Sequence, residues 1–229
     1  MAYNTGPKIV TDGLVLCLDA ADRNSYPGSG STWYDLSGNG NNGTLVNGVG
    51  YSGDNLGSLS FDGVNDYVSG SIPPLTGNYT IEIIFKLITF NPSDNDLIAL
   101  TSSNAHGVLG EISSSDGKIR FLHRFPYGVS GGDTFYSSGS ISLNQIYSIS
   151  WVRDSNQKIY INGIFDSQIT STNSGFDSNL TQLTIGQLVQ NNSARIINGN
   201  VYSTKIYNRA LTPQEIQQNY NTTKGRFGL

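Results

Sequence analysis

Short apolar runs separated by polar turns dominate the chain. Residues 14–18 form a continuous apolar run that ends at Asp19, which is typical of a strand buried on both faces. From 79 to 87, apolar Ile81, Ile83 and Phe85 alternate with more polar positions, and this pattern predicts a strand with one core face. Together with similar segments the pattern gives about ten strands. The other predicted strands are 58–61, 66–69, 96–100, 118–124, 146–153, 158–161, 182–185 and 200–207.

Turn residues replace hydrophobic periodicity in two places. Gly, Asn and Ser dominate residues 22–57, for which we expect a long folded loop region. Asn162-Gly163 stands between two β-prone pieces and suits a type I′ hairpin, because both positions tolerate positive φ. Residues 1–7 are expected to form an extended N-terminal arm.

The helix signal is confined to the C-terminal part. Thr212-Pro213-Gln214-Glu215 is a capping box with proline at the first helical position, and it predicts a short helix over 213–220. Strands throughout, one late helix and no repeat of roughly 20–50 residues indicate an all-β fold of two antiparallel sheets. At 229 residues the chain fits one such domain, spanning 1–229.

Charge and composition argue against a nucleic-acid partner, a membrane-spanning segment and an internal disulfide. The formal net charge is -4 and no basic cluster is interleaved with aromatic residues, so we expect no nucleic-acid partner. No segment approaches the roughly 18 apolar residues of a spanning helix, and the N-terminus has no leader pattern, so we expect neither membrane insertion nor export. The single cysteine, Cys17, excludes an internal disulfide and lies in an apolar run, which predicts a buried thiol.

Five segments resemble the concanavalin A-like lectin/glucanase superfamily, specifically its laminin G-like domains from bacterial surface proteins and bacteriophage structural proteins. They are GLVLCLDA (13–20), WYDLSGNGNNGTL (33–45), LSFDGVNDYV (59–68), IYING (159–163) and GNVYSTKIYNRALTPQEI (199–216). The resemblance spans nearly the whole chain and implies a two-sheet antiparallel jelly-roll sandwich. One departure is Asn42, where related sequences often have His, so a role tied to that His is not expected.

The combination of this domain standing alone, without a leader, and ending in YNTTKGRFGL (220–229) is similar to virion structural proteins of tailed phages, cyanophages among them. This similarity implies a capsid decoration or tail-fibre component that is assembled in the host cytoplasm and exposed on the particle surface. Its implied partners are other virion proteins and a host-surface glycan. The alternatives are a bacterial surface carbohydrate-binding module, a passive structural protein and a polysaccharide hydrolase. No heptad segment supports a trimer, and homo-oligomerisation stays open.

Catalytic chemistry has little support in the residues. Members of the superfamily that cleave β-glucans use two glutamates on one strand, because retaining hydrolysis needs an acid and a nucleophile about 5–5.5 Å apart. The glutamates of this chain are Glu82, Glu111 and Glu215, which are far apart in sequence, and we expect no such pair. His106 and His123 lack zinc-ligand spacing, and no Gly-x-Ser-x-Gly motif is present. We therefore expect a non-enzymatic protein and assign no catalytic residue.

Aromatic residues beside Gly-rich loops are the candidate sugar-binding residues, because flat rings stack on sugar faces. These residues are Trp33, Tyr34, Tyr127 and Tyr136, with Phe135 next to the last of them. Trp33 has a second interpretation, as the apolar anchor of its long loop.

Calcium is the candidate cofactor, because the resemblance implies a rim site of carboxylate and carbonyl oxygens. Asp62, Asn65 and Asp66 form the best local cluster. The alternative is that these side chains bond local amides in a turn between two strands. Further oxygen donors in predicted loops are Asp94, Asn95, Asp96 and Asp133.

Overall fold

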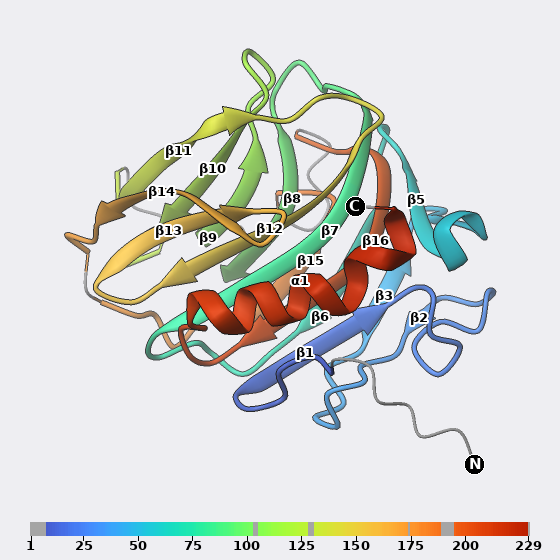
Figure 1. The fold of residues 1–229 in the computed structure, drawn as a ribbon, viewed down its shortest axis with the longest axis horizontal. Coiled ribbons are helices and arrows are strands. Elements are labelled where there is room, and N and C mark those ends of the chain that lie inside the picture. Colours follow the sequence, from blue (N-terminus) through green and yellow to red (C-terminus); the bar gives the residue numbers. More distant parts are fainter. Residues whose placement is uncertain (1–7, 103–104, 128–130, 174, 189–194, 229) are drawn as a thin grey trace.

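Two antiparallel β-sheets pack face to face in the computed structural model, which describes residues 8–102, 105–127, 131–173, 175–188 and 195–228 (Figure 1). In sheet A the strand order is β14-β13-β12-β7-β16-β5-β4, with β1 also paired to β16. In sheet B the order is β11-β10-β9-β8-β15-β6-β3-β2. The fold is therefore the predicted all-β sandwich with one C-terminal helix.

The strands of sheet A are β1 (Leu14–Asp19), β4 (Gly50–Ser52), β5 (Ser58–Asp62), β7 (Tyr79–Thr89), β12 (Ile146–Arg153), β13 (Asn156–Ile161), β14 (Ile164–Thr170) and β16 (Asn198–Tyr207). The strands of sheet B are β2 (Thr32–Trp33), β3 (Gly43–Val46), β6 (Tyr67–Ser71), β8 (Asn95–Ser102), β9 (Ala105–Ile112), β10 (Lys118–His123), β11 (Asp133–Ser140) and β15 (Gln182–Ile185). A 3-10 turn, η1 (Asp54–Leu56), and the helix α1 (Pro213–Phe227) complete the fold.

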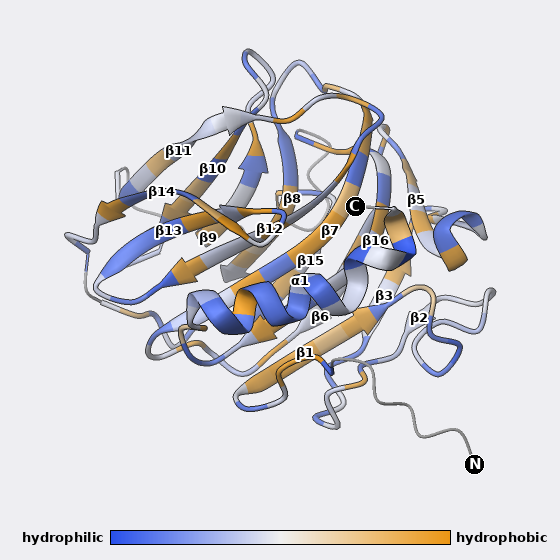
Figure 2. Ribbon diagram, viewed as in Figure 1, coloured by the Kyte–Doolittle hydropathy of each residue, from blue (hydrophilic) through white to orange (hydrophobic). Residues whose placement is uncertain are grey.

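The core lies between the sheets and is built from the apolar positions of both. Figure 2 shows these positions as orange bands along the strands, whereas α1 is mostly blue. The indole of Trp151 lies against Gly110, where a Cβ atom would come within 2.7 Å of the ring. Its Nε1 donates to the Arg120 carbonyl across the sandwich at 3.1 Å. Glycine at 110 is therefore required for the two sheets to approach at this point.

The helix α1 lies across the outer face of sheet A (Figure 1). Its capping box is formed as predicted: Thr212 Oγ1 accepts from Glu215 N, and Glu215 Oε2 accepts from Thr212 N. The predicted end at 220 was wrong, because the helix continues to Phe227. Its last turn is held by a tertiary contact, the 2.7 Å ion pair of Arg226 with Asp19, which no local sequence signal reveals.

The outer face of β7 is also buried, whereas alternation predicted a strand with one core face. α1 covers this second face, so a polar outward residue such as Glu82 is 5% exposed. Of the described residues, no helix is long and apolar enough to cross a membrane.

Residues 22–57 are more ordered than a loop, because β2, β3, β4 and η1 lie within them. Asp35 organises the stretch between β2 and β3. Its carboxylate accepts from the backbone amides of Cys17, Ser37 and Asn41 at 2.9–3.0 Å, which ties the segment to β1. The prediction of a long loop failed because these strands are two to four residues long and have no periodicity to detect. The predicted arm, 1–7, lies outside the described residues.

Candidate binding site on the outer face of sheet B

Four side chains from four adjacent strands form one row across the outer face of sheet B. Asp96 on β8 pairs in register with Glu111 on β9, Glu111 pairs with Arg120 on β10, and Arg120 pairs with Tyr136 on β11. Residues that are directly opposite in antiparallel strands project from the same face of the sheet. The row therefore runs from a buried acid to an exposed aromatic ring.

Glu111 is the charged centre of the row. Its side chain is 1% exposed, and its two oxygens accept from Arg120 Nη1 at 2.6 Å and Arg195 Nη1 at 2.7 Å. Burial alone would raise the pKa of Glu111, but hydrogen bonds from Asp96 and Arg120 and the charges of the two arginines outweigh burial and lower it. Glu111 is thus a carboxylate that holds two guanidinium groups in place.

Asp96 occupies the buried end of the row. Burial, the hydrogen bond to Glu111 and the Glu111 charge raise its pKa well above the usual range. Within the described part of the chain neither Asp96 oxygen receives a hydrogen bond. A raised pKa favours the protonated form, in which the carboxyl group of Asp96 can donate to Glu111.

The outer end of the row is open to solvent. Tyr136 is 47% exposed, and the Arg120 guanidinium lies 5.8 Å from the centre of its ring. Arg120 Nε also donates to Thr134 Oγ1 at 2.8 Å. The aromatic ring thus has a guanidinium and a hydroxyl fixed beside it, which is the kind of preorganised group that recognises a polar ligand.

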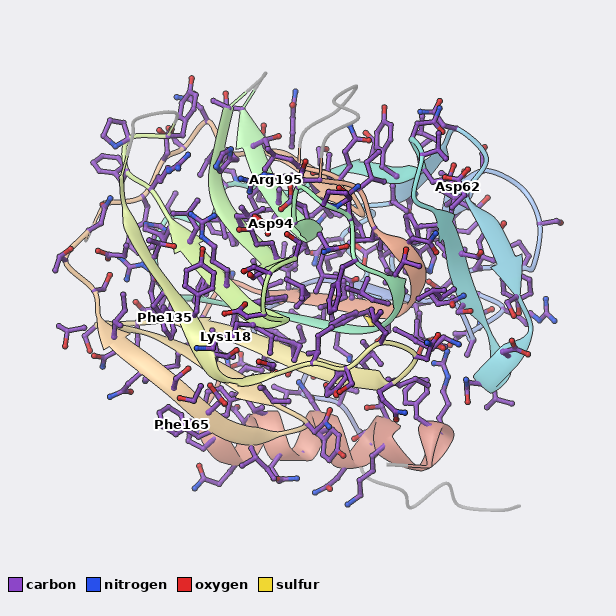
Figure 3. The ribbon with its side chains drawn as sticks, turned by 90° about the horizontal axis from the view of Figure 1, so that it is seen from above. Asp62, Asp94, Lys118, Phe135, Phe165 and Arg195 are labelled. Carbon is purple, nitrogen blue, oxygen red and sulfur yellow. The ribbon has the colours of Figure 1, made fainter. Side chains whose placement is uncertain are left out.

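A second polar group lies further along the same face. His106 on β9 is half-buried, and its Nε2 lies 2.7 Å from Nη1 of Arg124, the residue that follows β10. Burial and the charges of Arg124, Arg195 and Arg120 lower the pKa of His106 to about 4. Between the two polar groups a small apolar cluster of Ala99, Leu109 and Leu122 is covered by Leu188. Figure 3 shows Arg195, on the segment that follows Leu188, on the opposite side of the sandwich from α1.

Two carboxyl groups that lie apart in the sequence, those of Asp96 and Glu111, are neighbours in the structure. Strand pairing, which the sequence does not reveal, brings them together. Retaining hydrolysis needs about 5–5.5 Å between its carboxyl groups, so that a glycosidic bond fits between them. Asp96 and Glu111 instead contact each other directly and are both buried.

The predicted aromatic ligands do not converge. Trp33 is 0% exposed and belongs to the core, so it is the anchor of its segment and cannot stack on a ligand. Tyr34 is 47% exposed, but it follows β2, at the opposite edge of sheet B from Tyr136 on β11. Tyr127 is half-buried against the core, and Phe135 points inward. Tyr136 is therefore the one predicted aromatic that joins the row.

A hollow of about 530 Å³ lies near the start of β11, lined by Phe125, Gly132, Asp133, Thr172, Asn173 and Gly175. Asp133 fixes its floor by accepting hydrogen bonds from Ser171 Oγ at 2.6 Å and from the amides of Thr172 and Asn173. Because Asp133 and Asp96 lie on strands separated by β9 and β10, the predicted oxygen donors do not form one site. Asp94 and Asn95 instead bond neighbouring turn amides.

The predicted calcium residues lie together in the turn between β5 and β6. Asp66 Oδ2 accepts from Asp62 N at 3.1 Å, and Asp62 Oδ1 accepts from Val64 N at 2.8 Å, so both carboxylates make the turn contacts that were the alternative. Asp66 Oδ1 is buried and has no hydrogen-bond partner in the part of the chain that the structure describes, and Asn65 is exposed. Among the described residues no three His, Cys, Asp or Glu side chains gather as a metal site. Calcium at this turn stays a prediction.

Comparison with known proteins identifies the family. The family model described as the concanavalin A-like lectin/glucanases superfamily matches residues 61–217. The chain belongs to this superfamily. A search of curated protein sequences finds no match.

Solved structures of low sequence identity share the fold. The binding domain of Paraclostridial Mosquitocidal Protein 1 has a TM-score of 0.71 at 17% identity, over 93% of this chain and 52% of that one. A Trypanosoma rangeli sialidase mutant has a TM-score of 0.69 at 15% identity, over 96% of this chain and 34% of the sialidase chain. The botulinum neurotoxin type G receptor binding domain has a TM-score of 0.65 at 17% identity, over 91% of this chain and 51% of that chain. The chain thus spans about a third to a half of the length of these proteins.

Proposed function

We propose that this lectin-like domain is a non-catalytic carbohydrate-binding module whose ligand stacks on Tyr136. The observation that supports this proposal is the exposed Tyr136 ring with Arg120 and Thr134 fixed beside it. A sugar presents an apolar face and a rim of hydroxyl groups, which suit an aromatic ring flanked by hydrogen-bonding groups. Arg120 is held by Glu111 and Thr134, so little side-chain entropy is lost on binding.

The buried carboxyl pair supports binding over hydrolysis. Both oxygens of Glu111 are engaged by arginines, and Asp96 is 0% exposed beneath it. A general acid has to reach the glycosidic oxygen, and a nucleophile has to reach the anomeric carbon. Neither carboxyl group is placed to do so, and we assign both to positioning the arginines.

We extend the proposal to a setting on a virion surface, as a capsid decoration or a tail or fibre component that attaches to host glycans. This setting rests on the sequence resemblance to tailed-phage structural proteins. The alternative setting is a bacterial surface module with the same ligand class. Mass spectrometry of purified phage particles tests the setting. A virion component is expected in a fixed number of copies per particle, whereas a module of the bacterial surface is expected to be absent from the particles.

A pair of tyrosines provides the test of glycan binding. Tyr136 and Tyr34 are equally exposed, at 47%, on opposite edges of sheet B. On a glycan array, Tyr136→Ala is expected to weaken binding by about 2 kcal/mol, roughly 30-fold, as for an aromatic hot spot. Tyr34→Ala is the matched control and is expected to bind as the wild type does. Equal losses in both variants, or no bound glycan for the wild type, would contradict the proposal.

A further inference from the structure

Arg124 lies on the same face as the proposed sugar site and has no acidic partner among the described residues. Its Nε donates to the Gly131 carbonyl at 2.8 Å, and its Nη1 lies 2.7 Å from His106 Nε2. With its pKa lowered to about 4, His106 is neutral at pH 7 and accepts from Arg124 through Nε2. Both partners are therefore uncharged, and the positive charge of Arg124 is not compensated by either.

The surroundings of Arg124 add to this positive charge. Of the three arginines on this face, Arg120 and Arg195 share the single carboxylate of Glu111. Burial lowers the pKa of Arg124, and the charges of Arg120 and Arg195 lower it further. Arg195 is also close to Asp94 and Asp96, so Arg124 is the guanidinium of this face that has no acidic hydrogen-bond partner among the described residues.

Strand geometry aligns this charge with the aromatic ring. Arg120 and Arg124 are four residues apart, so their Cα atoms are separated by about 13 Å along the strand direction. Opposite them on β11, Tyr136 faces Arg120 and Thr134 faces Leu122. The Arg124 side chain packs beside Gly132, where a Cβ atom would come within 2.6 Å of Arg124 Cγ. Tyr136 and Thr134 on β11 and Arg124 beside the start of β11 thus lie in one line, over the length of a short oligosaccharide.

We propose that this surface, defined by Tyr136, Thr134 and Arg124, selects saccharides that carry a carboxylate. One sugar ring stacks on Tyr136, and the carboxylate of a neighbouring unit binds Nη2 of Arg124, for which the described residues provide no hydrogen-bond partner. Planar guanidinium groups bind carboxylates through two parallel hydrogen bonds, which a neutral sugar hydroxymethyl group cannot reproduce. The inference rests on the proposed glycan binding and specifies the charge of the ligand.

The first experiment compares matched ligands on an array that pairs neutral oligosaccharides with their uronic acids and includes sialylated glycans as a separate arm. The wild type is expected to bind an acidic member at least tenfold more tightly than its neutral pair. Arg124→Gln is expected to lose about 10- to 100-fold toward that acidic ligand, as for a charged hydrogen bond, and little toward the neutral one. Arg23→Gln, an exposed arginine in the segment before β2, is the control for the change in net charge.

The outcomes separate this inference from the function on which it rests. Binding of neutral glycans that depends on Tyr136 and is equal for wild type and Arg124→Gln overturns the charge preference and leaves the binding module standing. Absence of any glycan binding removes both. A preference for acidic glycans that Arg23→Gln weakens as much as Arg124→Gln also overturns the inference, because net charge and not the site would then be responsible.

A second measurement uses the wild-type protein and does not depend on the variant folding. His106 contacts Arg124 directly, so a carboxylate bound there lowers the positive potential at the imidazole. NMR titration of the His106 ring is expected to show a higher pKa in the presence of the acidic glycan that binds the array. Its neutral pair is expected to leave the pKa of His106 unchanged. An unchanged pKa with the acidic glycan bound would place the carboxylate elsewhere and overturn the proposal.

Discussion

Glu82 and Glu111 occupy equivalent places on the two outer faces of the sandwich, yet their surroundings differ. Each projects outward from a central strand, and each is buried. Glu82 accepts from Asn219 Nδ2 at 2.8 Å and Ser150 Oγ at 3.1 Å, whereas Lys205 Nζ is 3.9 Å away. Glu111 instead accepts from two arginines at 2.6 and 2.7 Å.

The difference lies in what covers each carboxyl group. Over Glu82 lies α1, whose Asn219 also bonds Val10 N and the Tyr207 hydroxyl, so the acid helps to fasten the helix to sheet A. Burial raises the pKa of Glu82 by more than Lys205 and its hydrogen-bond donors lower it. Glu111 is covered by its own arginines, which continue to the exposed Tyr136. One buried acid serves the fold, and the other shapes a surface.

The largest expected effect comes from replacing each glutamate with its neutral isostere. Glu111→Gln removes the charge that two partly buried arginines share, and we expect it to lower the free energy of unfolding by about 3 kcal/mol. Glu82→Gln is the matched variant and is expected to cost about 1 kcal/mol or less, because the Ser150 hydroxyl can rotate to accept from the new amide. Urea denaturation at pH 7 measures both, and equal losses would show that the two sites do not differ.

Sequence patterns could predict the fold but not this contrast. The buried run at 14–18, the Asn162-Gly163 turn and the capping box at Thr212 are local signals, and each appears in the structure as expected. Glu82 and Glu111 both look like lone polar residues in apolar strands. Their roles depend on which strand lies beside them and on whether a helix covers them, and neither is encoded within a few residues.

The same reasoning explains which residues of the candidate site the sequence could point to. Tyr136 was predicted from its type and its Gly-rich surroundings, which are local properties. The sequence did not point to Arg120, Arg124 and Arg195. Arg195 is 75 residues from Arg120 in the sequence, and the two meet at Glu111 only because β9 pairs with β10 and the chain later returns over sheet B. Trp33 was placed among the candidates on residue type, although burial makes it a core residue.

The pH dependence of the two variants offers a smaller effect of opposite sign. Because the pKa of Glu82 is higher in the folded protein than in the unfolded chain, the folded protein takes up this proton at a higher pH as the pH falls. The contribution of this protonation to stability is therefore complete below pH 4.5 and is lost as the pH rises above that value. The lowered pKa of Glu111 has the reverse effect: its contribution is present above pH 4.5 and is lost as pH falls below that value.

Stability measured from pH 3 to 7 is therefore expected to separate the variants. The advantage of wild type over Glu82→Gln grows as pH falls from 7 toward 4.5, whereas its advantage over Glu111→Gln shrinks below 4.5. Each slope is bounded by one proton, about 1.4 kcal/mol per pH unit. Thermal or urea unfolding in matched buffers provides the measurement, and slopes of the same sign would refute the opposite pKa shifts of the two acids.

Asp66 is a further buried acid, and it sharpens the comparison because, among the described residues, neither a helix nor an arginine bonds its carboxylate. Its Oδ1 has no donor within those residues, and the exposed oxygens of Asp62 and Asn65 lie in the same turn. If calcium binds there with a dissociation constant of about 1 mM, 10 mM calcium stabilises the fold by about 1.4 kcal/mol. We expect calcium chloride to raise the melting temperature of wild type but not of Asp66→Asn, with magnesium chloride as the control for ionic strength. An equal rise in both proteins, or none, would leave these residues with the turn as their whole role, so that the fold tolerates a buried Asp66 carboxyl group bonded through Oδ2 alone.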